Sequence, residues 1–520
     1  MPPVVQKNGQ MVTADALPTL QIDGVVWTQV MIGNTVYAAG DFSTARPAGA
    51  APDTSTTERK NLLAYSITTG KLSTTFKPAA LNGQVKALAV SPDKTTLYVG
   101  GDFTLVGTAK RLRFAAFNAS TGALRSTAPA FNGQVKAITV AGSSIYVGGL
   151  FTAVGTTSRS RLAALSVTTG KLTTWAPKAA DGVNALVATP DKTKIVVGGK
   201  FAKINTTAAL GMGAVDARTG VSRAWKVNTV VKDYGANSAI LSLAVDADTV
   251  YGSGYAYGGG NFEGAFAANP TDGSIRWLQD CHGDTYGVAP IGNTVYTVGH
   301  AHYCENMGGF PDTSPRVRWQ RALAVTKAAR GTVAVNGQSG AHYGNFAGKP
   351  APSLVNWFPQ LSAGTYTGMN QGPWSVVGNA TYVSAGGEFT TANGRRQQGL
   401  VRFAVPASAP NAQGPLYSDA TVAPQLSQPV PAAVQVDWLT NVDRDDRTLT
   451  YEVLRDDVVV HSVRAVAYFW KRPLLTWTDT AVTEGVTYAY AVRATDPNGN
   501  QVTSPVTEVA VQGSGTPAGG

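Results

Sequence analysis

Short apolar runs alternate with turn-forming residues along most of the chain, and long stretches with helical periodicity are absent. The segment 84–128 shows the pattern most clearly, because its apolar runs at 85–90, 97–103 and 112–117 are separated by polar turns. Runs of this length that are rich in Val, Tyr and Thr are typical of β-strands bounded by turns. A last short run begins at Ala123 after a Thr-Gly turn. The segment therefore predicts four short strands in about 45 residues.

This four-strand pattern recurs along the chain, and each of the first five units contains a turn glycine. These glycines lie 52, 48, 50 and 53 residues apart: Gly70, Gly122, Gly170, Gly220 and Gly273. A period near 50 residues with four strands in each unit indicates a β-propeller, in which every unit forms one blade. We count seven units and predict an all-β protein with a seven-bladed β-propeller at 25–406. Residues 1–24 are predicted to lead into the ring, with 20–22 closing the last blade as its outer strand.

A Gly-Gly pair followed two positions later by Phe recurs where a strand ends, as in Gly100-Gly101-Asp102-Phe103. Glycine at such a point provides a positive φ or lets another backbone segment approach closely. We therefore interpret the pair as structural and the Phe as a residue that packs between blades. The neighbouring Asp41, Asp102 and Glu388 either form a ring that holds a cation or sugar hydroxyls, or accept hydrogen bonds from local turn amides. We favour the turn amides.

A different pattern begins after residue 406. Residues 407–428 are rich in Pro, Ala, Ser and Gln and form a predicted linker. Residues 429–512 then alternate between apolar and polar positions, with an early Trp438 and with Tyr488 where a tyrosine corner lies in a β-sandwich. This segment resembles a fibronectin type III domain, which implies a small β-sandwich. Residues 513–520 are predicted to be a flexible tail.

The formal net charge of +10 is unevenly distributed along the chain. Residues 421–520 carry 7 Lys and Arg against 11 Asp and Glu, so the rest of the chain is strongly basic. The basic residues are scattered singly, however, and no nucleic-acid-binding motif is present, so no nucleic-acid partner is predicted. No run of about 18 apolar residues occurs, so insertion into a membrane is not predicted either.

Two cysteines, Cys281 and Cys304, are the only ones in the chain, and in a chain of extracellular character we expect them to form a disulfide. Several residues with metal-ligating side chains lie close to them in the sequence. These candidate ligands are His282, His300, His302 and Asp284. A His-x-His pair on a strand points both rings to one side, which suits a divalent metal site or general acid and base catalysis. The spacing matches no established metal motif, so a structural cluster around the disulfide is favoured and no cofactor is predicted beyond this metal.

The segment 251–266 is dense in aromatic residues and glycine. No helix follows its glycines, so it is not a phosphate-binding loop. Exposed aromatic rings stack on the faces of sugars, which makes the segment a candidate glycan-binding surface. The candidate binding residues are Tyr251, Tyr255, Tyr257 and Phe262. Motifs of serine hydrolases, kinases and dinucleotide-binding enzymes do not occur.

The chain as a whole resembles a family of actinobacterial secreted or surface β-propeller proteins, whose modules also occur in minor tail proteins of phages that infect actinobacteria. The resemblance rests on the opening 8–19, the Gly-Gly-Asp-Phe repeats, the segments 281–286 and 299–304, and the fibronectin-like end. The family is mostly of unknown function, and the resemblance provides no catalytic residues to transfer to this chain.

We therefore expect a non-enzymatic protein of a phage tail, or of the cell surface or extracellular space. It is expected to contact a glycan or cell-wall polymer of the actinobacterial envelope and, in a virion, other tail proteins. The first residues lack the charged-then-apolar pattern of a signal peptide, which favours a virion component. The alternative is a metal-assisted or carboxylate-based enzyme that degrades glycans at the propeller rim, which requires the histidines or paired carboxylates to converge in a pocket.

Overall fold

The computed structural model describes residues 11–338 and 343–513. The start of the predicted lead-in and nearly all of the predicted tail therefore lie outside the described residues. The described helices are three short 3₁₀ turns, η1 (Lys226–Thr229), η2 (Glu305–Met307) and η3 (Ala420–Val422). None of them is long and apolar enough to cross a membrane. All other regular structure described is β-strand, which confirms the predicted all-β class.

The chain divides into two compact units. The first comprises Met1–Val12, Ala16–Val355 and Pro359–Ala409, and the second comprises Thr13–Asp15, Asn356–Phe358 and Pro410–Gly520. The predicted linker thus belongs largely to the second unit.

The first unit contains, among its described residues, seven successive antiparallel sheets of three or four strands. The first strands of these sheets are β2 (Val25–Ile32), β7 (Val85–Val90), β12 (Val135–Ala141), β17 (Val183–Ala188), β23 (Ser238–Val245), β27 (Thr285–Ile291) and β31 (Pro373–Gly378). The second strands are β3 (Thr35–Asp41), β8 (Thr96–Gly101), β13 (Ser144–Gly149), β18 (Lys194–Gly199), β24 (Val250–Ala256), β28 (Thr294–Ala301) and β32 (Tyr382–Gly387). The third strands are β6 (Leu62–Ser66), β11 (Phe114–Asn118), β16 (Leu162–Ser166), β21 (Met212–Asp216), β25 (Gly264–Ala268), β29 (Gln320–Thr332) and β35 (Leu400–Ala404).

Three of these sheets have a fourth strand, namely β22 (Ser222–Arg223), β26 (Ile275–Gln279) and β30 (Pro350–Leu354). In the first three sheets the predicted outermost strand is reduced to one bridging pair, which joins Tyr65 to Leu72, Phe117 to Leu124 and Leu165 to Leu172. Short hairpins also lie between second and third strands: β9 (Leu105–Val106) with β10 (Ala109–Lys110), β14 (Ala153–Val154) with β15 (Thr157–Ser158), β19 (Lys203–Ile204) with β20 (Thr207–Ala208), and β33 (Thr391–Ala392) with β34 (Arg395–Arg396).

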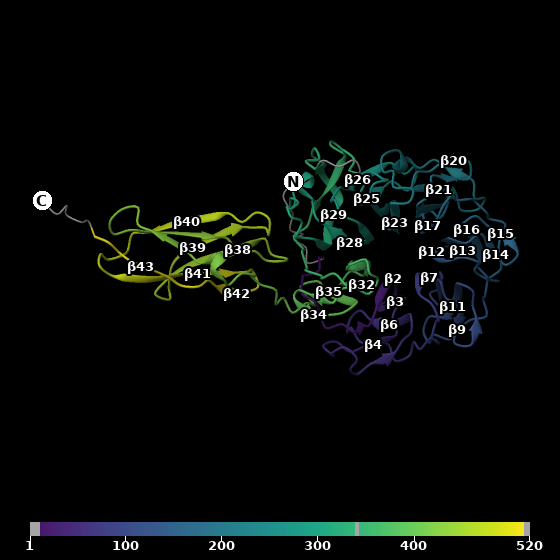
Figure 1. Cartoon of the computed structure of the whole chain (residues 1–520), viewed down its shortest axis with the longest axis horizontal. Coiled ribbons are helices and arrows are strands. Elements are labelled where there is room, and N and C mark those ends of the chain that lie inside the picture. The colour runs from purple at the N-terminus through teal and green to yellow at the C-terminus, as the bar shows by residue number, and fades with distance from the viewer. Residues whose placement is uncertain (1–10, 339–342, 514–520) are drawn as a thin grey trace. The chain divides into compact units, whose positions relative to one another are not determined.

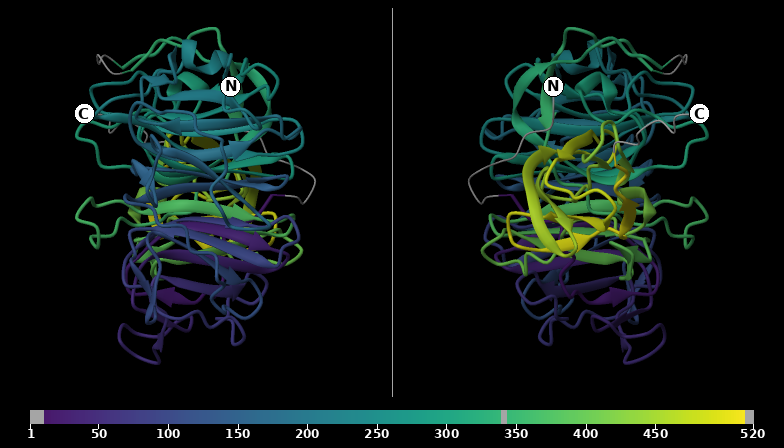
Figure 2. Two further views of the ribbon diagram at one scale, coloured as in Figure 1. Left: turned by 90° about the vertical axis from the view of Figure 1, so that its right-hand side faces the viewer. Right: turned by 90° about the vertical axis from the view of Figure 1, so that its left-hand side faces the viewer.

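The sheets follow one another around a ring. Each first strand packs beside the first strand of the next sheet, and β31 packs beside β2, so the row of sheets closes on itself. Strands β2, β7, β12, β17 and β23 lie toward the middle of the unit, whereas β9, β14 and β15 lie toward its outside (Figure 1). Figure 2 shows the ring edge-on, with its strands running across its thickness. The first unit is therefore a propeller-like domain.

Each first strand carries a β-bulge near its start. In the second sheet Lys86 is the extra residue of the bulge, opposite Gly100 and Gly101. A Cβ atom on Gly101 would lie 2.1 Å from the carbonyl oxygen of Gln84, and one on Gly100 would lie 2.3 Å from the Val135 side chain of the next sheet. The paired glycines therefore permit close approach of the bulged strand and of the neighbouring sheet, and neither has a positive φ.

Apolar clusters fill the spaces between neighbouring sheets. The phenylalanines that follow the glycine pairs, Phe103, Phe151 and Phe201, are buried in these clusters against the preceding sheet. Their predicted role in packing between sheets is confirmed.

The lead-in joins the two ends of the ring, but through different residues from those predicted. Leu17 forms a bridge with Arg402 of β35, and the Arg402 guanidinium donates to the Pro18 carbonyl at 2.6 Å and to the Thr19 hydroxyl at 3.2 Å. Arg402 is buried, so its donors need protein acceptors, which this stretch of the lead-in provides. The predicted outer strand at 20–22 instead contributes β1 (Gln21–Ile22), which forms a small sheet with β4 (Thr44–Arg46) and β5 (Thr57–Glu58).

The second unit contains two sheets. One has the order β36 (Gln425–Ser427), β37 (Val434–Leu439) and β40 (Leu474–Asp479). The other has the order β39 (Val458–Val466), β38 (Thr448–Arg455), β41 (Thr487–Thr495) and β42 (Gln501–Thr503), with β43 (Thr507–Ala510) also paired to β41. Alternate residues of both sheets form one core around Trp438, Tyr451 and Tyr490.

Candidate functional site

A cavity of about 710 Å³ lies at one rim of the ring, beside the fifth and sixth sheets. It is bounded by the connection from β24 to β25, by residues next to β27 and β28, and by the long segments that follow β28 and β29. We call this cavity the rim pocket. Its lining residues are Ala236, Asn237, Tyr255, Tyr257, Glu263, Asp284, His300, His302, Arg316, Tyr343 and Gln371.

The rim pocket brings together residues that the sequence assigned to two separate sites. Tyr255 and Tyr257 belong to the predicted glycan-binding segment, whereas Asp284, His300 and His302 belong to the predicted metal set. The Tyr257 side chain is 78% exposed, and Tyr255 is half-buried. Parts of the two candidate sites therefore line one pocket.

Two other predicted glycan-binding residues do not reach solvent, and their assignment is corrected. Tyr251 is completely buried, where its hydroxyl donates to Asp246 Oδ2 at 2.9 Å and its ring lies near Trp277. Phe262 is also completely buried and packs edge-on against Phe346. Both side chains serve the core, because an aromatic ring without access to solvent has no face left for a sugar.

His300 is held by a hydrogen-bond network at the base of the rim pocket. Its Nε2 accepts from the Asp284 backbone amide at 3.3 Å, so its Nδ1 carries the proton in the neutral ring. Nδ1 lies 2.8 Å from Gln371 Oε1 and 3.1 Å from the hydroxyl of Tyr286, which itself donates to Asp284 Oδ2 at 3.1 Å. Burial lowers the pKa of His300, in agreement with a neutral ring.

Two carboxyl groups of the rim pocket have raised pKa values. Burial, together with the charge of Asp284, raises the pKa of Glu263 to about 7. Burial also raises the pKa of Asp284, although the neighbouring His300 and the Tyr286 hydroxyl oppose this shift. Glu263 Oε2 accepts from the Gly283 amide at 2.6 Å, which fixes its position. A buried pair of this kind is one in which one carboxyl group holds a proton near neutral pH.

A second network supports the opposite wall of the rim pocket. Asp312 accepts from both Nε and Nη2 of Arg316, and its Oδ2 lies 3.1 Å from His302 Nδ1. Gln338 links this carboxylate to His282, since it donates to Asp312 at 2.7 Å and its Oε1 lies 2.7 Å from His282 Nδ1. Burial and the nearby Arg316 lower the pKa of His302 to about 4, so its ring is neutral at physiological pH.

The predicted disulfide between Cys281 and Cys304 is present, with a Cα–Cα distance of 4.4 Å. Beside it, the His302 amide donates to the His282 carbonyl at 2.8 Å. The bond therefore joins the segments that carry the two histidines. The His282 ring is completely buried and stacks on Tyr343 at 3.9 Å, outside the pocket lining.

The four candidate metal ligands do not converge in the structure. Within the described residues, one group of three metal-ligating side chains has ligand atoms within 4.8 Å of one another. It lies in the second unit and consists of Asp443, Asp445 and Asp446, so it contains none of the four candidates. The histidines instead have separate partners, as described above. A divalent metal at these histidines stays a prediction without a converging ligand set.

The acidic residues beside the glycine pairs have different partners. Asp102 Oδ2 accepts from the side-chain amides of Gln84 and Gln134, both at 2.7 Å, and so links two neighbouring sheets. Glu388 accepts from the Thr367 amide at 2.8 Å and from its hydroxyl at 2.7 Å. The favoured interpretation as acceptors of local turn amides therefore describes neither residue, because Asp102 accepts from side-chain amides and the amide bound by Glu388 is 21 residues away in the chain.

Several lining residues of the rim pocket were missed from the sequence. Glu263 is the one acidic residue of the aromatic segment 251–266, and this isolation in an apolar context is a signal that points to it. Arg316, Tyr343 and Gln371 come from long irregular segments that follow no repeat, so no spacing argument reaches them.

Comparisons with known proteins indicate the fold. The family model of the Rax2 C-terminal β-propeller domain matches residues 62–182, which is less than half of the chain and does not place it in that family. No curated protein matches. Among solved structures, the β-propeller domain of Cps50 (Swd1) from Myceliophteria thermophila matches at 9% identity and a TM-score of 0.42, covering 75% of this chain and 99% of that chain. This TM-score is too low to carry an argument. With the ring of sheets, the family match supports a β-propeller domain, a fold that suggests a binding or structural role.

Proposed function

We propose that this protein is a non-enzymatic binding protein that engages a glycan or cell-wall polymer of the actinobacterial envelope through the rim pocket. One observation carries the proposal: the pocket combines the exposed ring of Tyr257 and the half-buried ring of Tyr255 with polar groups already held in place. Aromatic faces stack on the apolar faces of sugars, and polar groups beside them bind the hydroxyls and fix the orientation of the ligand.

The polar groups are pre-organised, which favours binding. His300 and Gln371 are held by one network, and Arg316 is held by Asp312. Groups that are already ordered lose little conformational entropy when a ligand arrives. A pocket of about 710 Å³ has room for a sugar residue of a longer polymer.

We further propose that the first unit is a seven-bladed propeller and that the second is a fibronectin type III-like domain. The closed row of seven described sheets supports the blade number. In the second unit, a three-stranded sheet and a sheet of order β39, β38, β41 and β42 share one core. The Tyr488 hydroxyl accepts from the Thr483 amide at 3.1 Å, a few residues upstream, as in a tyrosine corner.

The setting that we propose is a phage tail, with the cell surface or extracellular space as the alternative. The disulfide supports a protein that works outside the reducing cytosol. In a virion the partners of this protein are other tail proteins, and the rim pocket is the surface that meets the host envelope.

The test is co-sedimentation of the purified protein with isolated actinobacterial cell walls. We expect the native protein to sediment with the walls and the double variant Tyr255→Ala/Tyr257→Ala to stay in solution. Tyr257→Phe keeps the ring and is expected to sediment, and Val221→Ala, at a 56% exposed position outside the pocket, is the matched control. Equal sedimentation of the double variant and the control overturns the role of the rim pocket.

A second candidate function is carboxylate-based glycan cleavage, which the raised pKa of Glu263 beside Asp284 favours. A protonated Glu263 is suited to donate a proton to a glycosidic oxygen, while an ionised Asp284 supports the charge that develops on the sugar. Mass spectrometry of the supernatant, with and without chelator, distinguishes the two functions. Released sugar fragments that disappear in Glu263→Gln support cleavage, and sedimentation without fragments supports binding alone.

A further inference from the structure

The seven β-bulges of the first unit occupy the same position in every sheet. In each sheet, two consecutive residues of the second strand pair with first-strand residues that lie two positions apart. The first-strand residue between them is the extra residue of the bulge. We call these extra residues the bulge ring. They are Trp27, Lys86, Lys136, Asn184, Leu241, Tyr286 and Trp374.

All seven residues of the bulge ring line one cavity of about 480 Å³ along the inner strands. A bulge re-aims a side chain and ends regular pairing, so seven bulges at one level direct seven side chains toward a common space. The next layer along the strands is apolar at most positions, as at Leu88, Ile138 and Leu186. The polar and aromatic side chains are thus concentrated at the mouth of the central channel.

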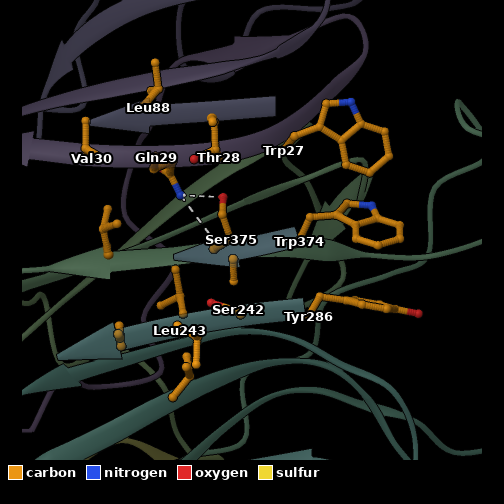
Figure 3. Close-up of a pocket in the computed structure, with 18 of the residues that line it drawn as sticks. Trp27, Thr28, Gln29, Val30, Leu88, Ser242, Leu243, Tyr286, Trp374 and Ser375 are labelled. Carbon is orange, nitrogen blue, oxygen red and sulfur yellow. Dashed lines mark hydrogen bonds between the residues drawn. The ribbon is translucent and has the colours of Figure 1, made fainter. Parts of the chain in front are cut away.

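Three aromatic members of the bulge ring form a continuous arc. Tyr286 stacks on Trp374 with centroids 4.1 Å apart, and Trp374 meets Trp27 edge-on at 4.8 Å. Figure 3 shows the three side chains one above another on the same side of the pocket. Trp27 is further fixed by donation from its Nε1 to Gln84 Oε1 at 3.0 Å. Trp27 and Trp374 are partly exposed and offer apolar ring surface beside the channel, whereas Tyr286 is buried and packs against Trp374.

Two lysines continue the ring from this arc. Lys86 Nζ lies 3.3 Å from the centroid of the Trp27 ring, and Lys136 Nζ donates to Asn184 Oδ1 at 2.5 Å. Among the described residues, no carboxylate lies within 4.0 Å of either ammonium group. The nearby Asp102 has its Oδ2 occupied by the amides of Gln84 and Gln134.

Two neighbouring half-buried ammonium groups without a carboxylate within 4.0 Å destabilise the fold. At Lys86, burial and the charge of Lys136 disfavour the ammonium form more than Asp102 and Asp41 favour it. Burial, followed by the charge of Lys136, lowers the pKa of Lys86 to about 7. Apolar side chains at these positions would fill the channel without this destabilisation, as they do one layer further in. A bound anion reduces the repulsion between the two ammonium groups and is attracted by both of them.

We propose that the mouth of the central channel is a binding site for an acidic sugar, with the Trp27 and Trp374 part of the aromatic arc on the sugar ring and Lys86 and Lys136 on its carboxylate or phosphate group. This site goes beyond the proposed function, because its two lysines and two tryptophans are not part of the rim pocket. Tyr286 connects the two places, since it stacks in the arc and hydrogen-bonds to His300 and Asp284.

The experiment is a titration of the full chain, followed by tryptophan fluorescence and by calorimetry. The probes are glucuronic acid, glucose 6-phosphate, inorganic phosphate and, as the neutral analogue, glucose. We expect the two acidic sugars to bind and glucose to bind at least tenfold more weakly, because the lysines require an anion. If glucuronic acid binds more tightly than glucose 6-phosphate, the site prefers a carboxylate; the reverse order indicates a phosphate. The difference in affinity between glucose 6-phosphate and inorganic phosphate measures the contribution of the aromatic arc to binding.

The variants assign the effect to the bulge ring. Lys86→Met/Lys136→Met is expected to weaken binding of the acidic sugars at least tenfold, whereas Lys110→Met/Lys171→Met removes two exposed lysines and leaves it unchanged. Thermal melting verifies folding, and Lys86→Met alone serves if the double variant does not fold. Equal affinity of the native protein for glucose and the acidic sugars, or unchanged affinity in the folded lysine variant, overturns the proposal. Tyr255→Ala/Tyr257→Ala is expected to retain acidic-sugar binding. A wrong assignment of cell-wall binding to the rim pocket can therefore be distinguished from a wrong assignment of acidic-sugar binding to the bulge ring.

Discussion

In the rim pocket, the polar side chains come from irregular segments, and most of them are already paired with one another. In the bulge ring, the side chains come from one repeated position of regular strands, and among the described residues neither lysine forms an ion pair within 4.0 Å. His300, for example, uses both ring nitrogens within the protein, whereas the Lys86 ammonium lies over the face of Trp27 and has no carboxylate within 4.0 Å among the described residues. The irregular segments thus form a pre-organised pocket, whereas the repeated strand position forms a charged ring whose lysines an anionic ligand would neutralise.

The first prediction concerns the disulfide, which stabilises segments of the rim pocket but lies outside the bulge ring. Cys281→Ser/Cys304→Ser removes the disulfide that joins the His282 and His302 segments, and we expect about 3 kcal/mol of stability to be lost. The bulge ring is held by strand pairing and does not depend on this bond. Chemical denaturation measures the loss, and titration with glucose 6-phosphate is expected to give native affinity while cell-wall sedimentation is weakened. Equal weakening of both activities would show that the two regions share their support.

The second prediction concerns the buried carboxyl of the rim pocket. In the unfolded chain Glu263 ionises near pH 4.3, but in the folded chain it stays protonated up to about pH 7, because burial and Asp284 raise its pKa. Between these values the folded state holds the additional proton, so stability falls as the pH rises through this window. Glu263→Gln cannot ionise, and we expect it to be more stable than the native protein at pH 8 by about 2 kcal/mol. Denaturation at pH 4 and pH 8 measures this; an unchanged difference between the two proteins contradicts it.

The third prediction uses pH on the bulge ring, where a rising pH removes the positive charge of Lys86. Lys86 has a pKa of about 7, lowered by burial and by Lys136 and raised in part by Asp102 and Asp41. It is mostly charged at pH 6 and mostly neutral at pH 8, so affinity for an acidic sugar is expected to fall roughly tenfold across this range. In Lys86→Met this pH dependence disappears. Titration of glucose at both pH values is the control, and a native pH profile in the variant contradicts the assignment.

The sequence predicts the repeat well because its signals are local. Turn glycines with a period near 50 residues and the Phe after each glycine pair follow from short-range chemistry, and the structure has strands and sheet contacts where they indicate. The sequence analysis did not identify the bulge ring, although its positions follow a regular pattern. Each member comes directly after a buried residue that pairs with the second glycine of the pair or its equivalent, as Lys86 comes after Val85. Once the position of the bulge in one sheet is known, the equivalent residue of the other six sheets can be located in the sequence.

The rim pocket was predicted only in part, for a physical reason. Tyr255, Tyr257, Asp284, His300 and His302 were identified by residue type, but their convergence depends on long insertions that no period describes. The same limitation explains Tyr251 and Phe262, since aromatic density in a sequence does not separate a ring that faces solvent from one that faces the core.

The smallest expected effect tests whether the rim pocket binds through its exposed ring. Tyr257 is 78% exposed, so Tyr257→Ala removes little packing and is expected to leave the melting temperature unchanged. If the ring stacks on a sugar, the same change weakens cell-wall binding by about 1 kcal/mol, or about fivefold, while acidic-sugar binding at the bulge ring stays native. Tyr257→Phe separates the ring from its hydroxyl, because it retains the stacking face. Loss of binding in both variants would assign the effect to the hydroxyl, and native binding in Tyr257→Ala would remove this ring from the site.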